Sequence, residues 1–226
     1  MVQSKITIGY TYYKNSVGWE IIQEKYKDCP HDLLIVDDAS PDPIAVNNSW
    51  TTYKINEDIG WNNEGARNLI VQEAKTDWIA LIDMDWYLED FNIDLSVLDK
   101  NTMYHFWCPE AAQWKGKTYD HNQILVHRDH FMNLGGYWTN DRGWYGLDGT
   151  IKTKYKFLGN IKLLPHKLRY NFEGDINYIE SEQLCTGDTI ELIRGIKEEK
   201  NAPKWAVPAN LLEHLDLKLP FSWEKL

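Results

Sequence analysis

The chain has 226 residues, 43% of them hydrophobic, and a formal net charge of -10 at pH 7. This length suits one domain with a sizeable core, so we expect a single active site. The acidic balance, which no run of Lys and Arg offsets, argues against a protein that binds polyanions over a broad surface. No apolar stretch is long enough for a signal peptide or a membrane span, so we expect a cytoplasmic protein without a transmembrane segment.

The first 100 residues alternate strand-like and helix-like patterns. Strands are predicted at 6–9, 33–36, 53–55 and 78–82, and a helix at 17–26. Asn62 or Asn63 can cap a second helix, whose apolar residues recur on one face. This alternation predicts an α/β fold with a mostly parallel, doubly wound sheet flanked by helices. In such a sheet, ligands bind beyond the carboxyl ends of the strands.

The second half of the chain is less regular. Strands are predicted at 104–108, 123–126 and 161–164, and a helix at 147–158 that Gly159 can close. Beyond Lys167 no pattern favours a particular structure. We find no repeat and no linker, so we expect one domain over 1–226.

Two carboxylates, Asp83 and Asp85, follow the buried strand at 78–82. Residues i and i+2 of a strand face the same side, so both side chains can point into one cleft at the strand's end. A divalent cation held by carboxylates can neutralise the charge of a leaving diphosphate. The alternative is that Asp83-Met84-Asp85 only caps a turn.

Four segments carry a family resemblance, and they occur in the order ITIGYTYYKNS, LLIVDDASPD, NEDIGWNNEGARNLIVQEAKTDWIALIDMD and LGGYWTNDRGWYGLDGTIKTKYKFLG. In these segments the chain resembles the family 2 glycosyltransferases of the GT-A fold. The resemblance covers about the first two thirds of the sequence. It implies a Rossmann-like GT-A fold and the transfer of a sugar from a nucleotide-sugar donor.

The resemblance also implies roles for single residues. It places the nucleobase on Asp37 or Asp38, and the diphosphate or ribose near Arg67. It implies that Asp85 binds the metal and that Asp83 lies near the ribose and the metal. The alternatives are that Asp37 and Asp38 cap a turn and that Arg67 forms an ion pair on the helix surface.

Two further residues are candidates for binding the nucleotide sugar. Thr11 lies in the first matching segment, at the first predicted strand. Trp61 precedes the second predicted helix, where its ring can stack on a base or on the substrate. Packing in the core is an equally good explanation of Trp61.

An acceptor hydroxyl needs a base to receive its proton, and Asp148 is the candidate. In the similar enzymes an acidic pair after a Gly-Gly-Tyr or Gly-Gly-Phe turn starts a helix, and its second acid is the base of an inverting reaction. The pair here is Leu147-Asp148, so only the base position is retained. Trp144 and Tyr145 offer flat faces for an acceptor sugar. The alternatives are that Asp148 only caps the helix and that the two aromatic residues only pack in the core.

A Mn²⁺ or Mg²⁺ ion needs more ligands than Asp83 and Asp85 provide. His166 is the candidate third protein ligand, because related GT-A galactosyltransferases can place a metal-binding His after the corresponding helix and strand. His127 and His130 compete for this role, and a lone His is as often structural.

These residues together predict an inverting, metal-dependent transferase that uses a UDP-sugar. Residues 1–100 would form the nucleotide-sugar half and 101–226 the acceptor half. A nucleotidyltransferase is an alternative, although no Gly-rich phosphate loop with a Lys lies near the first strand. A non-catalytic sugar- or nucleotide-binding module is another. The acceptor is a glycan or another molecule with a hydroxyl group, and the acidic balance disfavours a hydroxylated DNA base.

Overall fold

The computed structural model describes residues 5–60, 62–111, 119, 122–139, 148–171 and 215–226. Its helices are α1 (Ser16–Lys25), α2 (Asn63–Glu73), α4 (Arg128–Asn133) and α5 (Asp148–Leu158), with short 3-10 helices at Leu95–Val97 and Pro109–Ala111. Its strands are β1 (Thr7–Tyr12), β2 (Asp32–Asp37), β3 (Thr51–Ile55), β4 (Trp78–Ile82), β5 (Trp86–Leu88), β6 (Thr102–Trp107), β7 (Ile124–His127), β8 (Asn160–Tyr170) and β9 (Trp223–Lys225).

The first half of the chain forms the parallel part of the sheet. The described strands lie in the order β5-β8-β6-β7-β4-β1-β2-β3-β9, and β3, β2, β1 and β4 run parallel to one another. The chain moves outward from β1 to β3 and then returns to the other side of β1 at β4. The border between β1 and β4 is therefore the point where the strand order reverses, which is where open α/β sheets bind ligands.

The second half turns this into a mixed sheet. β7 is antiparallel to β4 and to β6, and β6 pairs in parallel with β8. β5 and β9 each add an antiparallel pairing, to β8 and to β3. The predicted parallel order thus holds for β1 to β4.

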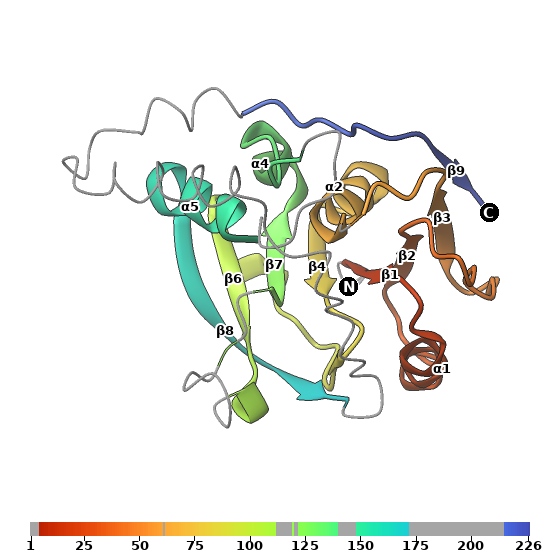
Figure 1. Cartoon of the computed structure of the whole chain (residues 1–226). Coiled ribbons are helices and arrows are strands. Elements are labelled where there is room, and N and C mark those ends of the chain that lie inside the picture. The colour runs from red at the N-terminus through yellow and green to blue at the C-terminus, as the bar shows by residue number, and fades with distance from the viewer. Residues whose placement is uncertain (1–4, 61, 112–118, 120–121, 140–147, 172–214) are drawn as a thin grey trace.

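Helices cover both faces of the sheet. Alternate strand residues face α1 on one side, where Trp19 and Ile22 are buried, and α2 on the other, where Leu69 and Ile70 are buried. α4 and α5 lie on the same side as α2 (Figure 1). No helix among the described residues has the length and apolar character needed to cross a membrane.

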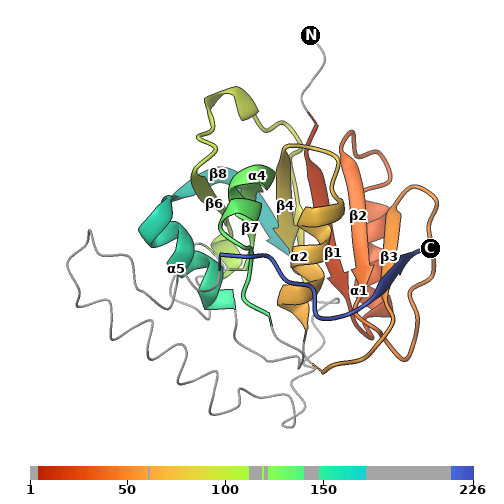
Figure 2. The ribbon, with the colours of Figure 1, turned by 90° about the horizontal axis from the view of Figure 1, so that it is seen from above.

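The C-terminal segment crosses the helical face. It passes over α2 on the way from α4 to β3 (Figure 2). Its Phe221 ring lies against the first turn of α2, where a Cβ on Gly65 would come within 2.8 Å of it. β9 then pairs antiparallel with β3 and forms the edge of the sheet next to it.

Candidate active site at the carboxyl ends of the parallel strands

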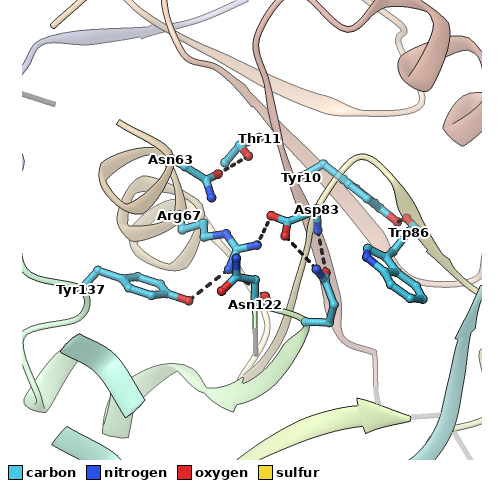
Figure 3. A network of polar contacts seen from close by, with 9 residues as sticks. Tyr10, Thr11, Asn63, Arg67, Asp83, Trp86, Asn122 and Tyr137 are labelled. Carbon is cyan, nitrogen blue, oxygen red and sulfur yellow. Dashed lines mark hydrogen bonds and ion pairs between the residues drawn. The ribbon is translucent and has the colours of Figure 1, made fainter. Parts of the chain in front are cut away.

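The predicted polar residues meet at one edge of the sheet. Thr11 pairs in register with Val36, one residue before Asp37, and Tyr10 pairs with Ile82, one residue before Asp83. Because these strands are parallel, their carboxyl ends share an edge. α2 begins at this edge, and the Thr11 hydroxyl donates a hydrogen bond to the side chain of Asn63 there (Figure 3).

Both carboxylate oxygens of Asp83 receive a hydrogen bond from the protein. The Arg67 guanidinium donates to Oδ1, and Gln123 Nε2 donates to Oδ2 at 2.7 Å (Figure 3). The Gln123 amide oxygen also accepts the main-chain N–H of Asp83 at 2.8 Å. Gln123 directly precedes β7, which pairs antiparallel with β4 and so brings this side chain to the end of β4.

The Arg67 side chain is a buried charge with several partners. It is only 1% exposed, and its Nη1 donates to the Asn122 carbonyl at 2.7 Å and to the Tyr137 hydroxyl at 3.1 Å. Burial is the largest influence and opposes its charge, but Asp83, Tyr137 and Glu64 together outweigh burial and raise the pKa of Arg67 above its ordinary value. The guanidinium is thus permanently charged and faces Asp83 from within the protein.

Asp85 is positioned by a different set of elements. Its carbonyl accepts the main-chain N–H of Asn171 at 2.6 Å, at the end of β8. The next carbonyl, that of Trp86, accepts the Tyr10 hydroxyl at 3.0 Å. The two acids are therefore fixed independently: Asp83 by α2 and the residue before β7, and Asp85 by β1 and β8.

The two acids that follow β2 differ in their surroundings. Asp37 accepts the main-chain N–H groups of Ser40 at 2.8 Å and Ile44 at 2.9 Å, so both of its oxygens hold the loop after β2. Asp38 accepts the Asn62 side-chain amide at 2.9 Å and also bonds to the main-chain N–H of Asn62. Burial raises the pKa of Asp38 to about 7. Ala39, the next residue, has a φ of 53°, a conformation that non-glycine residues seldom adopt.

The Asn62 side chain donates a hydrogen bond to Asp38 instead of capping α2. Asn62 is the N-cap residue of α2, yet its side chain makes no capping hydrogen bond. The first N–H groups of α2 therefore lack the side-chain acceptor that such a residue commonly provides. This leaves a positive helix end beside Asp38 and Asp83.

Comparison with known proteins supports the fold assignment. No protein-family model matches the chain, and no curated protein matches it. A crystal structure of GalNAc-T7 with UDP, GalNAc and Mn²⁺ superposes with a TM-score of 0.63 over 93% of this chain, at 11% identity. The chain has the GT-A fold of glycosyltransferases. It covers 54% of the GalNAc-T7 chain, or about half its length.

Two other matches superpose less well. The catalytic domain of Drosophila beta1,4galactosyltransferase 7 with xylobiose has a TM-score of 0.46 at 15% identity, over 70% of this chain and 64% of that one. The glycosyltransferase GlyE of Streptococcus pneumoniae TIGR4 has a TM-score of 0.37 at 9% identity, over 57% and 35%.

Within this GT-A fold, the candidate histidines lie away from the two acids. His166 Nε2 contacts the Asn92 carbonyl at 2.9 Å. His166 precedes Tyr170 on β8 by four residues, about 13 Å of strand, and Tyr170 is the residue that pairs with Trp86 beside Asp85. His127 pairs with Trp78, at the opposite end of β4 from Asp83. No group of three or more His, Cys, Asp or Glu residues suited to a metal occurs in the described ranges.

The remaining candidates lie partly outside the described residues. Trp61, Trp144 and Tyr145 are among those not described. Asp148 is described as the first residue of α5, as predicted, but its side chain is not.

α5 is connected to α2 through one turn. Asn68 on α2 binds both main-chain groups of Tyr137, accepting its N–H at 2.8 Å and donating to its carbonyl at 2.9 Å. From α5, Lys154 donates to the Gly136 carbonyl at 2.7 Å. Burial lowers the pKa of Lys154 to about 8. Residues 136–137 thus connect α2 with the helix that begins at Asp148.

Proposed function

We propose that the chain is a metal-dependent glycosyltransferase that moves a sugar from a UDP-sugar to an acceptor hydroxyl. The observation that carries this proposal is the placement of Asp83 and Asp85 at the strand-order reversal of a GT-A sheet, beside the start of α2. The GalNAc-T7 structure, which contains UDP, GalNAc and Mn²⁺, supports the choice of donor and metal class. Residues 1–100 would bind the nucleotide sugar and 101–226 the acceptor.

The side chains around Asp85 fit a hard divalent cation, Mn²⁺ or Mg²⁺. Carboxylate and amide oxygens are the ligands such ions prefer. Asn171, whose main-chain N–H donates to the Asp85 carbonyl, is 7% exposed, and its side-chain amide oxygen is the atom that would bind the ion. Asp83, Asp85 and Asn171 would hold the ion, which would offset the charge on the leaving diphosphate. Asn171 replaces His166 as the candidate third ligand because it adjoins Asp85.

The acids after β2 favour a uracil base. Asp37 has both oxygens bound to the loop, whereas Asp38 is bonded by the side chain and main chain of Asn62 and would present one acceptor to the base. One acceptor suits the single N–H on the pairing edge of uracil, while guanine presents two N–H groups there. Asp38 would therefore read the base, and the first N–H groups of α2 would face the phosphates.

The chemistry assigned to α5 is proton removal from the acceptor. Asp148 would take the proton of the acceptor hydroxyl as its oxygen bonds to the anomeric carbon and the bond to the diphosphate breaks. Attack from the face opposite the leaving group inverts the anomeric configuration. Trp144 and Tyr145 would pack against an acceptor sugar. The acceptor is proposed to be a glycan or another hydroxyl-bearing molecule, and a hydroxylated DNA base is less favoured.

The test is calorimetric titration with UDP in the presence of Mn²⁺, after nucleotide sugars have been screened by thermal shift. Asp85→Ala should weaken metal-dependent UDP binding by roughly tenfold or more, because the diphosphate loses charge compensation. Asp28→Ala, which removes an exposed carboxylate next to α1, is the matched control and should bind as the parent does. Equal UDP affinity in folded Asp85→Ala and in the parent would remove the central assignment.

A further inference from the structure

Two buried tyrosines hold the segment that follows Asp85. The Tyr10 hydroxyl donates to the Trp86 carbonyl at 3.0 Å (Figure 3). The Tyr26 hydroxyl accepts the main-chain N–H of Leu88 at 2.7 Å, and the two hydroxyl oxygens lie 2.9 Å apart. Tyr10 is 0% exposed and Tyr26 1%. Tyr10 belongs to β1 and Tyr26 is the C-cap residue of α1, so elements from the start of the chain hold β5 in place.

The donor and acceptor in each of these hydrogen bonds are fixed. A carbonyl can only accept, so Tyr10 gives its one hydroxyl hydrogen to Trp86. Tyr26 must then donate to the Tyr10 oxygen, and its own oxygen accepts the Leu88 N–H. Burial and the neighbouring Tyr26 raise the pKa of Tyr10, so its hydroxyl keeps the proton. The bonds therefore run in one direction, from the Leu88 N–H through both hydroxyls to the Trp86 carbonyl.

The two tyrosines occupy one edge of β5. Among the described strands, β5 pairs only with β8. On that side, the Asp85 carbonyl accepts the Asn171 N–H at 2.6 Å. The Trp86 carbonyl and the Leu88 N–H point to the opposite side, because the main-chain groups of neighbouring residues alternate between the two edges of a strand. An edge strand needs partners for such groups, and the tyrosine hydroxyls provide them in place of another strand.

A carboxylate can hold a cation at a set position only if the main chain that carries it is fixed. Asp85 lies between β4 and β5, and the carbonyl of the residue after it is the one that Tyr10 binds. We propose that Tyr10 and Tyr26 are positioning residues for Asp85, whose hydroxyls fix its main chain on the side opposite β8. Loss of either hydroxyl would let this segment shift while every proposed metal and nucleotide ligand stays in the chain. This inference rests on the proposed role of Asp85 as a metal ligand.

Calorimetry with UDP in Mn²⁺ and with UDP in EDTA tests this role in Tyr10→Phe, which removes only the hydroxyl oxygen. UDP affinity in Mn²⁺ should fall by roughly tenfold, the lower end of the effect of outer-shell partners on metal sites. UDP affinity in EDTA should stay at the parent value, because Asp85 acts only through the metal. Tyr104→Phe is the matched control. The Tyr104 hydroxyl also accepts a main-chain N–H, that of Asp99 at 2.8 Å, but its ring lies against Trp78 at the start of β4. This control should bind UDP as the parent does.

Tyr26→Phe and the double variant test whether the two hydroxyls act together. Tyr26→Phe retains the bond from Tyr10 to Trp86, so UDP affinity in Mn²⁺ should fall by only about threefold. The double variant should lose roughly tenfold and not the roughly thirtyfold of independent sites, because both substitutions interrupt the same set of bonds. It also replaces Tyr10→Phe if that variant does not fold, since it leaves neither hydroxyl alone in the core.

Three outcomes would overturn the inference while leaving the proposed function intact. The first is equal UDP affinity in Mn²⁺ for the parent and for folded Tyr10→Phe. The second is an equal loss of affinity in Mn²⁺ and in EDTA, because Tyr10 would then support the whole site and not the metal ligand. The third is a double variant in which the two single losses multiply. A parent protein that binds UDP no better in Mn²⁺ than in EDTA would instead refute the proposed function.

Discussion

Replacing Asp38 by Asn should make the protein more stable and at the same time weaken its binding to UDP. Asp38 is 8% exposed, and burial raises the pKa of its carboxyl group to about 7. An unfolded chain has an Asp pKa of about 3.9. The folded protein therefore resists ionisation of Asp38, and its free energy of unfolding falls as the pH rises from about 4 to 7. Above about pH 7 this loss is complete.

The size of the effect follows from these two pKa values. Ionisation of Asp38 lowers the free energy of unfolding by about 1.5 kcal/mol at pH 5 and by about 4 kcal/mol at pH 8. The difference, about 2.5 kcal/mol, should be absent in Asp38→Asn, since Asn does not titrate in this range. The new side chain is nearly isosteric, and its oxygen can still accept the Asn62 amide, whose bond to Asp38 is 2.9 Å long.

Urea unfolding of the parent and of Asp38→Asn at pH 5 and pH 8 measures this difference. All other groups titrate alike in the two proteins, so the change in their stability gap between the two pH values isolates Asp38. Asp37→Asn is the matched control. It should lower stability by roughly 1–3 kcal/mol, because an amide cannot accept both the Ser40 and Ile44 N–H groups.

The same variant tests the base contact. Asn in place of Asp38 should weaken UDP binding by roughly tenfold or more, because an acceptor for the uracil N–H is lost. UDP affinity of the parent should rise between pH 6 and 8 as the carboxyl ionises. A constant stability gap between the parent and Asp38→Asn at the two pH values would refute the ionisation argument. Unchanged UDP affinity would refute the base contact.

Two predictions concern other parts of the chain. Asp148→Asn should retain its fold and its affinity for the donor but slow transfer by roughly a hundredfold, and the parent should give a product of inverted configuration. The control Asp129→Asn, in the first turn of α4, should turn over at the parent rate. Parent-like turnover of Asp148→Asn, or retained configuration, would leave Asp148 only a helix cap. Phe221→Ala should lower the free energy of unfolding by about 3 kcal/mol in urea titrations, because the Phe221 ring is buried on the first turn of α2. Leu226 is 44% exposed, so the control Leu226→Ala should lower it by less than about 0.5 kcal/mol. A loss below about 1 kcal/mol for Phe221→Ala would mean that the C-terminal segment adds little to stability.

The sequence predicted the first half of the chain well because its signals are local. The apolar run at 78–82 coincides with β4, and the helix expected after Asn62 is α2. β2 and β4 are continuous apolar runs that are almost fully buried, and a polar cluster follows each of them. The sheet edge where Asp38 and Asp83 lie follows from strand order alone, without knowledge of any side-chain contact.

The contacts that distinguish the acids were not predictable in this way. Gln123 meets Asp83 only because β7 runs antiparallel to β4, a pairing between segments 40 residues apart. Local periodicity does not specify such a pairing or its register. Arg67 was expected near the diphosphate, and the structure places its guanidinium on Asp83. A buried Arg on the apolar face of an amphipathic helix was the available signal, since such a charge needs an acidic partner.

The connection between the two halves of the site is a consequence of the sheet's mixed topology. β7 runs antiparallel to β4, so α4 and the turn after it lie beside α2. There the Asn68 side chain bonds to both main-chain groups of Tyr137, as a neighbouring strand would. Gly136 must be glycine there, because its φ is 58° and a Cβ would approach the Asn68 oxygen to 2.4 Å. On its other side, Lys154 holds the same turn to α5. The distance between Asp83 and the start of α5 therefore depends on hydrogen bonds within a packed core. The proposed mechanism, in which a base acts opposite the leaving group, would require such a rigid connection.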